Sequence, residues 1–193
     1  MNITVYCGAA EGQDPEYMER ARELGAWMAA NDHTLIYGAG NAGMMGAVSD
    51  ALIEGGGKAI GVTPKFFILA EETRNDLAEV IISDNMSTRR NWMIDNGDAF
   101  IALPGGMGTL DEITEVMTYK RLGLLGKVNK PVMIYNVNGY YDLFFSYLDD
   151  MLKQGFCRQL DRDNVIEVKC LDDIAGALDS AGGIDETRTS RYD

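Results

Sequence analysis

Short apolar segments rich in β-branched and aromatic residues alternate along this chain with longer segments in which apolar residues recur every three or four positions. Several of the short segments lack polar alternation, which is typical of strands covered on both faces, and the longer ones have the period of amphipathic helices. Such alternation indicates βαβ units around a parallel sheet. We therefore predict an α/β fold with a doubly wound, mostly parallel sheet and helices on both faces, as in Rossmann-like proteins.

The same pattern places the individual elements. Strands are expected at Ile3–Tyr6, Thr34–Tyr37, Ala59–Val62, Val80–Ile82, Ala99–Leu103, Val132–Tyr135 and Val165–Val168. The first helix follows Asp14, which can cap it, and Pro15 suits its first turn. Its sheet-facing stripe is formed by Tyr17, Ala21, Leu24 and Met28. Further helices are expected at about Met44–Glu54, Met86–Asn96, Thr109–Leu122, Tyr141–Lys153 and Asp172–Ser180.

Chain length and composition predict one domain. The chain has 193 residues, 46% of them hydrophobic, which is enough for one good core and short for two. No repeat or linker divides it, so we expect a single Rossmann-like domain over residues 1–181. Residues 182–193 have almost no apolar content and are expected to form a frayed polar tail.

Charge and residue content exclude several functions. The net charge of −13 repels nucleic acids and anionic membranes, although local cations and helix N-termini can still hold a small phosphorylated ligand. Three widely spaced cysteines and one histidine form no recognisable metal motif, so we expect neither a metal nor another cofactor. Because no targeting segment and no apolar run of about 20 residues is found, a cytoplasmic protein is expected.

A first glycine cluster follows the second strand and opens a helix, with the spacing GxGxxG at Gly38, Gly40 and Gly43. Glycines in this position let the backbone approach a phosphate or ribose, and we regard these three residues and Asn41 as candidate substrate contacts. An NAD site is disfavoured, because the cluster follows the second strand and the next strand lacks an acidic residue to hold the ribose. A tight turn without ligand contact is the other interpretation.

A second cluster, Pro104-Gly105-Gly106-Met107-Gly108-Thr109, follows an apolar strand and again opens a helix. Three glycines in four positions allow consecutive backbone N–H groups to face one anion, and Thr109 adds a hydroxyl. No lysine precedes this threonine, which excludes a nucleoside-triphosphate P-loop. The carboxylates Asp111 and Glu112 follow at once, either for chemistry or merely to stabilise the helix dipole.

Adjacent arginines, Arg89 and Arg90, lie on the helix that starts near Met86. Neighbouring helical residues point about 100° apart, so both cannot serve one bidentate contact and we expect separate roles, one reacting and one positioning. The alternative is a pair of solvated surface cations. Met86 and Met93 are seven residues apart and are interpreted as core residues.

Taken together, these segments resemble the LOG (Lonely Guy) family of cytokinin riboside 5′-monophosphate phosphoribohydrolases, formerly often labelled lysine decarboxylase-like. The resemblance covers nearly the whole chain. It rests on the following segments: Val5-Tyr6-Cys7-Gly8, Tyr37–Gly46, Ile60-Gly61-Val62-Thr63-Pro64, Met86-Ser87-Thr88-Arg89-Arg90 and Pro104–Glu112, where the family's PGGxGTxxE motif is complete.

The resemblance implies roles for particular residues. The family's catalytic pair corresponds to Arg89 and Glu112. Its substrate contacts, together with the glycine-cluster candidates above, correspond to Gly105, Gly106, Met107, Gly108, Thr109, Arg90, Glu71 and Thr118. Two departures are Ala39, where the family has the central glycine of a GGG turn, and Arg90, where it usually has lysine. We expect Ala39 to add a methyl group near the ligand and Arg90 to keep the charge but not the geometry.

The implied reaction is hydrolysis of the N-glycosidic bond of an adenosine 5′-monophosphate, with or without an N6 substituent, as in cytokinin activation. Glu112 would activate water and offset charge on an oxocarbenium-like ribose, and Arg89 would hold the carboxylate or steer the leaving group. The family also implies a homodimer with its sites near the interface. The expected ligand is this small nucleotide, and no nucleic acid or membrane partner is expected.

Two other activities are compared with this one. Decarboxylation on pyridoxal phosphate needs a buried Schiff-base lysine, and no lysine lies in a recognisable cofactor segment. The lysines are Lys58, Lys65, Lys120, Lys127, Lys130, Lys153 and Lys169. The alternative function is a non-hydrolytic carrier or sensor of the same fold that binds a nucleotide or the molybdenum cofactor, for which the glycines would be needed but Glu112 would not.

Overall fold

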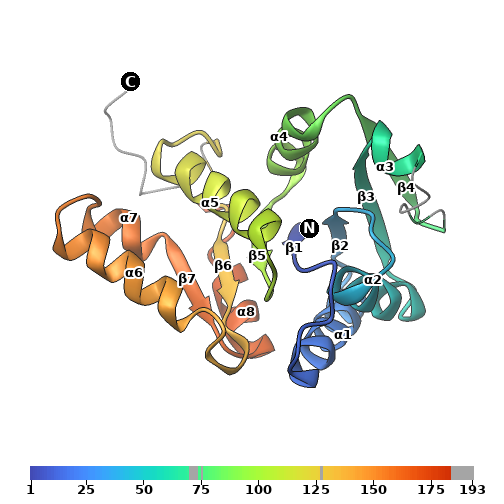
Figure 1. Ribbon diagram of the computed structural model, residues 1–193, viewed down its shortest axis with the longest axis horizontal. Coiled ribbons are helices and arrows are strands. Elements are labelled where there is room, and N and C mark those ends of the chain that lie inside the picture. Colours follow the sequence, from blue (N-terminus) through green and yellow to red (C-terminus); the bar gives the residue numbers. More distant parts are fainter. Residues whose placement is uncertain (70–73, 75, 127, 184–193) are drawn as a thin grey trace.

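The computed structural model describes residues 1–69, 74, 76–126 and 128–183, and its centre is a seven-stranded parallel sheet (Figure 1). The strand order is β4-β3-β2-β1-β5-β6-β7. The strands are β1 (Asn2–Tyr6), β2 (Thr34–Tyr37), β3 (Lys58–Pro64), β4 (Glu79–Ser83), β5 (Ala99–Ala102), β6 (Val132–Tyr135) and β7 (Val165–Val168). The predicted doubly wound α/β fold is confirmed.

Helices connect these strands. They are α1 (Pro15–Ala30), α2 (Gly43–Glu54), α3 (Lys65–Leu69), α4 (Met86–Asn96), α5 (Met107–Arg121), the 3-10 turn η1 (Val137–Gly139), α6 (Asp142–Lys153), α7 (Gln159–Asp163) and α8 (Leu171–Leu178). Asp14 caps α1 as predicted, because its Oδ1 accepts a hydrogen bond of 3.0 Å from the backbone N–H of Glu16. The sequence pattern missed α3, α7 and η1, which are too short to show a helical period.

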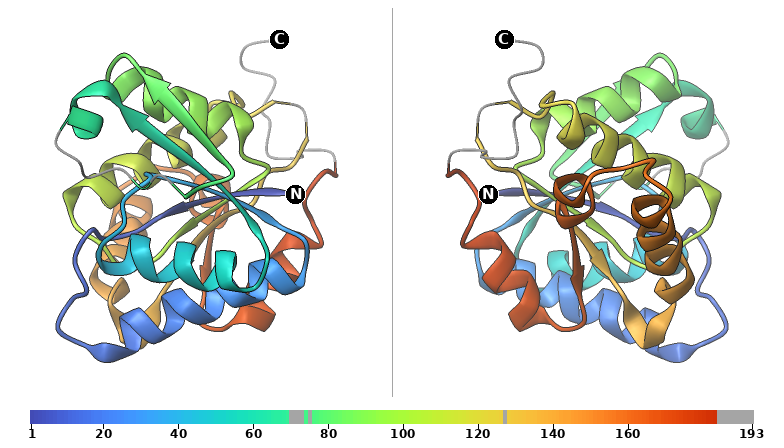
Figure 2. Two further views of the ribbon diagram at one scale, coloured as in Figure 1. Left: turned by 90° about the vertical axis from the view of Figure 1, so that its right-hand side faces the viewer. Right: turned by 90° about the vertical axis from the view of Figure 1, so that its left-hand side faces the viewer.

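Two helical layers cover the sheet (Figure 2). Apolar side chains of α1, α2 and α8 form one core with one face, and those of α4, α5 and α6 form a second core with the other. Helices α1 and α2 approach closely at Gly25, where a Cβ atom would lie 2.1 Å from the carbonyl oxygen of Val48. Glycine is therefore required at this crossing.

The sheet order reverses at β1, which pairs with β2 on one side and with β5 on the other. Connections run to opposite faces from this point, so a crevice opens outside the carboxyl ends of β1, β2 and β5. Both glycine clusters follow strands that end there.

Two further predictions concern the C-terminal tail and membrane-spanning helices. Gly182 and Gly183 exchange backbone hydrogen bonds with Asn129, at 2.9 Å and 2.7 Å. The start of the predicted tail is thus attached to the body, and residues 184–193 lie outside the described residues. Crossing a bilayer takes about 20 apolar residues in a helix, and no helix in the described part of the chain meets that requirement.

Candidate active site

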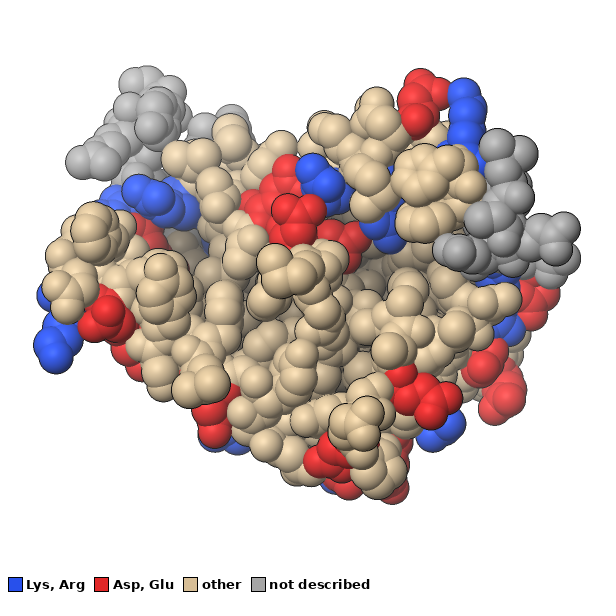
Figure 3. All heavy atoms as spheres, in the orientation of Figure 1, with Lys and Arg blue, Asp and Glu red and all other residues tan. Residues whose placement is uncertain are grey.

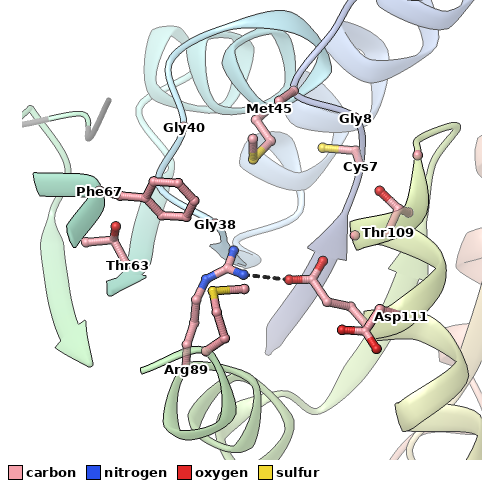
Figure 4. A pocket seen from close by; sticks show the side chains of 15 residues that line it. Cys7, Gly8, Gly38, Gly40, Met45, Thr63, Phe67, Arg89, Thr109 and Asp111 are labelled. Atoms are coloured by element: carbon pink, nitrogen blue, oxygen red, sulfur yellow. Dashed lines mark hydrogen bonds and ion pairs between the residues drawn. The ribbon is translucent and has the colours of Figure 1, made fainter. Parts of the chain in front are cut away.

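A pocket of about 400 Å³ lies at the carboxyl ends of β1, β2 and β3 and at the first turns of α4 and α5 (Figure 4). This position is the switch point of the sheet. The residues that line it are Cys7, Gly8, Ala9, Gly38, Gly40, Met45, Thr63, Phe67, Met86, Arg89, Gly106, Gly108, Thr109, Asp111 and Glu112. The volume falls within the range of about 300–1,000 Å³ that is usual for small-ligand sites.

An ion pair between Arg89 of α4 and Glu112 of α5 forms one wall of the pocket. Nη1 of Arg89 lies 2.8 Å from Oε1 of Glu112, and the two side chains are only 9% and 11% exposed. Nε of Arg89 also donates a hydrogen bond of 2.8 Å to the carbonyl oxygen of Val62. The guanidinium group is therefore fixed by Glu112 and by the Val62 carbonyl, and it in turn fixes the carboxylate of Glu112 at the wall of the cavity.

The environment of Glu112 raises the pKa of its carboxyl group. Burial is the largest cause, because it disfavours the charged form, while the positive charge and hydrogen bond of Arg89 act in the opposite direction. A buried carboxylate with a raised pKa and one free edge toward a cavity has the properties of a general base.

Gly38, at the end of β2, leaves the room that Arg89 occupies. A Cβ atom on Gly38 would lie 2.4 Å from Nη2 of Arg89. One residue of the first glycine cluster thus allows the guanidinium group to reach Glu112.

The second glycine cluster forms the N-terminus of α5. Gly106 occupies the N-cap position and has no side chain that could cap the helix. A Cβ atom on Gly106 or Gly108 would meet nothing within 4 Å, because both residues face the open pocket. The first N–H groups of a helix lack intrahelical partners and carry partial positive charge, so this surface can hold an anion.

Thr109 is the third member of this cluster that lines the pocket. It is 3% exposed, and a Cβ atom on Gly105 would lie 2.2 Å from its Oγ1. Gly105 itself is not among the lining residues; its lack of a side chain allows the threonine to pack under the loop. Met107 points away and is 81% exposed.

Arg90 faces away from the pocket and binds carboxylates of α5. Its Nε lies 2.6 Å from Oε2 of Glu115, and its Nη1 lies 3.2 Å from Oδ2 of Asp111. Acidic and basic side chains gather on the surface where α4 faces α5 (Figure 3). The two arginines are thus separated as the helix geometry predicts. Arg90, a predicted substrate contact, lies outside the lining of the pocket.

Only part of the first glycine cluster reaches the cavity. Gly38 and Gly40 line it, whereas Asn41 and Gly43 do not. Gly43 has φ +56°, and a Cβ atom there would lie 2.3 Å from the carbonyl oxygen of Ala9, so this glycine serves the turn. Ala39 adopts φ +62° and is 1% exposed; its methyl group packs against Gly61 and not against the ligand space, contrary to our expectation.

The remaining predicted contacts are not part of this pocket. Thr118 is exposed on α5, and its hydroxyl donates to the carbonyl oxygen of Thr114 at 2.9 Å. Glu71 lies outside the described residues.

Several lining residues were not predicted from the sequence. Cys7 and Thr63 come at the carboxyl ends of β1 and β3, so the rule for parallel sheets could have identified them. The expectation that Met86 and Met93 both belong to the core holds for Met93 alone, because Met86 lines the pocket together with Phe67 and Met45. No sequence signal distinguishes these two methionines, because both have the period of a buried face.

Two further reactive side chains, Cys7 and Lys120, are buried. Burial, with a smaller contribution from Glu112, raises the pKa of the Cys7 thiol and keeps it protonated. Lys120 is 3% exposed but does not line the pocket, and its Nζ donates to the carbonyl oxygen of Lys130 at 3.2 Å. Among the described residues, no group of three or more His, Cys, Asp or Glu side chains is placed to hold a metal ion.

Comparison with known proteins adds sequence relatives. The model of a family described as "Possible lysine decarboxylase" matches residues 45–178. The chain is 36% identical to cytokinin riboside 5′-monophosphate phosphoribohydrolase LOG3 of Arabidopsis thaliana, over 92% of this chain and 81% of that protein. It is 38% identical to the cytokinin riboside 5′-monophosphate phosphoribohydrolase of Rhodococcoides fascians, over 92% and 87%.

Solved structures share the fold at lower identity. The molybdenum cofactor binding protein of Rippkaea orientalis superposes with a TM-score of 0.67 at 23% identity, over 93% of this chain and 95% of that one. A Moco carrier protein of Chlamydomonas reinhardtii gives a TM-score of 0.67 at 21% identity, over 92% and 94%. Identities this low establish a common fold and nothing about the ligand.

Proposed function

Since the chain belongs to the cytokinin riboside 5′-monophosphate phosphoribohydrolase family, whose family model carries the older description of possible lysine decarboxylase, we propose that it is a hydrolase of nucleoside 5′-monophosphates. The bond cleaved is the N-glycosidic bond of an adenosine 5′-monophosphate with or without an N6 substituent. The products are the free base and ribose 5-phosphate. The observation that carries the proposal is the buried Arg89–Glu112 pair, in the same pocket as an uncapped helix N-terminus.

The N-terminus of α5 binds the 5′-phosphate in this proposal. Gly106 and Gly108 leave the backbone open toward the pocket, and Thr109 adds its hydroxyl. The partial positive charge of the helix end then attracts a dianion despite the acidic surface of the protein. A substrate without the phosphate would lose this contact, so nucleosides should be poor substrates.

Glu112 acts on the water that attacks C1′. It follows Gly108 by four residues, on the same helix face and about 6 Å further along the axis, so a ribose bound through its phosphate extends toward the carboxylate. Glu112 removes a proton from the water, whose oxygen bonds to C1′ while the electrons of the C1′–N bond leave with the base. The departing base takes up a proton from solvent, and Glu112 returns its own proton to solvent. The negative carboxylate also offsets the positive charge that develops on the ribose.

Arg89 positions Glu112 and limits the rise of its pKa. The guanidinium group fixes one carboxylate oxygen at 2.8 Å and leaves the other for water. Its charge keeps a buried acid in the deprotonated form that a base requires. Because the leaving base accumulates negative charge, a cation at this wall also favours bond cleavage.

The base lies toward the apolar side of the pocket. Phe67, Met45 and Met86 line this side, and flexible thioethers beside an aromatic ring accommodate a planar purine. The unmodified and the N6-substituted nucleotide are both candidate substrates for this surface.

We place this reaction in a cytoplasmic homodimer whose ligand is the small nucleotide. The dimer is supported by apolar side chains beyond the end of α5, where Leu122 is 38% exposed and Leu124 is 60% exposed. Covering these side chains with a second copy would remove apolar surface from water, which favours association.

The catalytic assignment is tested with Glu112→Ala and Arg89→Ala. Each should lower base release at least about 100-fold, the usual contribution of a general base, and leave the Kd for AMP within a few-fold. Release is followed by chromatography of the base, and binding by calorimetry. A carrier of the same fold would show binding in the native protein and no base release in any variant.

Glu115→Ala is the matched control, because Glu115 lies one turn further along α5 and pairs with Arg90 outside the pocket. It should retain turnover. Unchanged turnover in Glu112→Ala would exclude the mechanism, whereas equal losses in Glu112→Ala and Glu115→Ala would indicate a general weakening of the contact between α4 and α5.

A further inference from the structure

The segment after β6 contacts the loop that follows β5 through two side chains that are not part of the pocket lining. The hydroxyl of Tyr140 donates a hydrogen bond of 2.7 Å to the carbonyl oxygen of Gly105. The hydroxyl of Tyr141 donates one of 2.7 Å to the carbonyl oxygen of Leu103. Two consecutive tyrosines thus hold two carbonyl groups of the loop that begins α5.

The bond from Tyr140 determines where the next backbone donor points. The Gly105–Gly106 peptide is trans, so the carbonyl of Gly105 and the N–H of Gly106 point in opposite directions. Gly106 lines the pocket and Tyr140 does not. With the carbonyl turned outward to Tyr140, the N–H of Gly106 is turned inward to the cavity.

We propose that Tyr140 is a positioning residue for substrate binding: its hydroxyl orients the Gly105–Gly106 peptide so that the N–H of Gly106 binds the 5′-phosphate. The role rests on the proposed function, because it concerns the phosphate subsite of that reaction. Hydrogen bonding to the carbonyl also polarises the peptide and strengthens its N–H as a donor.

The surroundings of Tyr140 hold its hydroxyl in place. Asn138 and Gly139 have φ +49° and +74°, and this turn directs the tyrosine back under the loop. Its ring packs edge-on against Tyr17 and Tyr141, with centroids 5.5 Å and 4.9 Å apart. Although Tyr140 is 43% exposed, its ring therefore has contacts on two sides.

Tyr141 provides a matched control in the same segment. It is 2% exposed and makes a hydrogen bond of the same length to the same loop. The residue after Leu103 is Pro104, which has no N–H, so anchoring this carbonyl orients no donor toward the pocket. Loss of the Tyr141 hydroxyl should weaken the fold and leave phosphate binding unchanged.

The test compares Tyr140→Phe and Tyr141→Phe in the full chain, by calorimetry with ribose 5-phosphate and with adenosine. Tyr140→Phe should raise the Kd for ribose 5-phosphate roughly fivefold, as expected for one hydrogen bond, and leave that for adenosine unchanged. The KM for AMP should rise by the same factor while kcat stays within about twofold. In ¹⁵N spectra, the Gly106 amide should respond to ribose 5-phosphate in the native protein and less in this variant.

Each outcome decides the role of Tyr140. The role is supported if Tyr140→Phe loses affinity for ribose 5-phosphate alone. Tyr141→Phe should then lower the Tm and keep the native Kd values. Equal losses in both variants, a parallel loss for adenosine, or native affinity in Tyr140→Phe would overturn it while the proposed function stands. A native protein that binds ribose 5-phosphate but releases no base would contradict the hydrolase and leave the Tyr140 comparison intact; one that binds no phosphorylated ligand would contradict both.

Discussion

At the scale of single residues, the site depends on opposing effects on one carboxyl group. Burial raises the pKa of Glu112, and Arg89, 2.8 Å away, lowers it. A completely unpaired buried acid would stay protonated and could not accept a proton, whereas a fully solvated one would be a weak base. The pairing with Arg89 allows burial and ionisation at the same residue.

We predict that the carboxyl group of Glu112 titrates above the value of about 4.3 that is ordinary for glutamate, and higher again in Arg89→Gln. Titration of the ¹³C-labelled carboxyl by NMR measures both shifts. Because the folded pKa is raised, this group's contribution to stability is complete below the unfolded pKa and is lost as pH rises through the folded pKa. Activity has the opposite dependence and falls as Glu112 is protonated.

A midpoint below the ordinary value would show that Arg89 outweighs burial. An unchanged midpoint in Arg89→Gln would show that the pair has no electrostatic coupling. Either result would contradict the role assigned to the pair.

Sequence alone could predict the two charged residues but not their surroundings. The separation of Arg89 from Arg90 follows from the 100° between adjacent helical positions, and the structure has them bound to different carboxylates, Glu112 and Glu115. Met86 could not be distinguished from a core methionine, because its position on the helix is compatible with the core and with the pocket lining alike. The direction of the Ala39 methyl group depends on a left-handed backbone conformation that its own residue type does not favour.

At the scale of elements, α5 carries both the proposed anion site and the proposed catalytic carboxylate. The sequence pattern placed its start at Thr109, but the helix begins at Met107 and includes Gly108. Glycine has a low helix propensity, which is why the pattern placed Gly108 outside the helix. Gly108 lines the pocket, and under the proposed function a side chain there would enter the space of the phosphate.

We predict that Gly108→Ala weakens substrate binding without harming the fold. A Cβ atom at this position meets nothing within 4 Å, and alanine stabilises a helix by up to about 1 kcal/mol relative to glycine. Thermal unfolding should therefore show an equal or higher Tm, while the KM for AMP rises at least about tenfold because the methyl group occupies the anion site.

Gly176→Ala in α8 is the control for this substitution. It also adds a Cβ atom with nothing within 4 Å inside a helix, away from the pocket lining. It should stabilise the protein and leave the KM unchanged. A native KM in Gly108→Ala would show that the phosphate binds elsewhere.

At the scale of the whole molecule, the alternation of strands and helices predicted the class of fold. It did not predict which strands are neighbours in the sheet. Strands far apart in sequence, β1 and β5, are neighbours in the sheet, and the pocket lies where they meet. No local pattern encodes that pairing, because it depends on the direction in which each connection crosses the sheet. The short helices α3 and α7 were not predicted because each has five residues, which are too few to show a helical period.

We predict that the protein is a homodimer at micromolar concentration and that Leu124→Glu shifts it toward monomer. A charge placed at this 60%-exposed leucine would be desolvated in an interface, and each chain already carries a net charge of −13. Sedimentation velocity measures the distribution. Leu143→Glu on α6, where the side chain is 86% exposed, controls for the added charge, and a native protein that sediments only as a monomer would contradict the dimer.

The central claim is tested most directly by incubating the purified protein with AMP, N6-isopentenyl-AMP, GMP, CMP and adenosine and separating the free bases by chromatography. The account predicts that base is released from an adenosine 5′-monophosphate and that adenosine, which lacks the phosphate bound by α5, is cleaved little or not at all. Bound nucleotide without release of any base would contradict a hydrolase and would favour a carrier, and equal cleavage of adenosine and AMP would contradict the phosphate site.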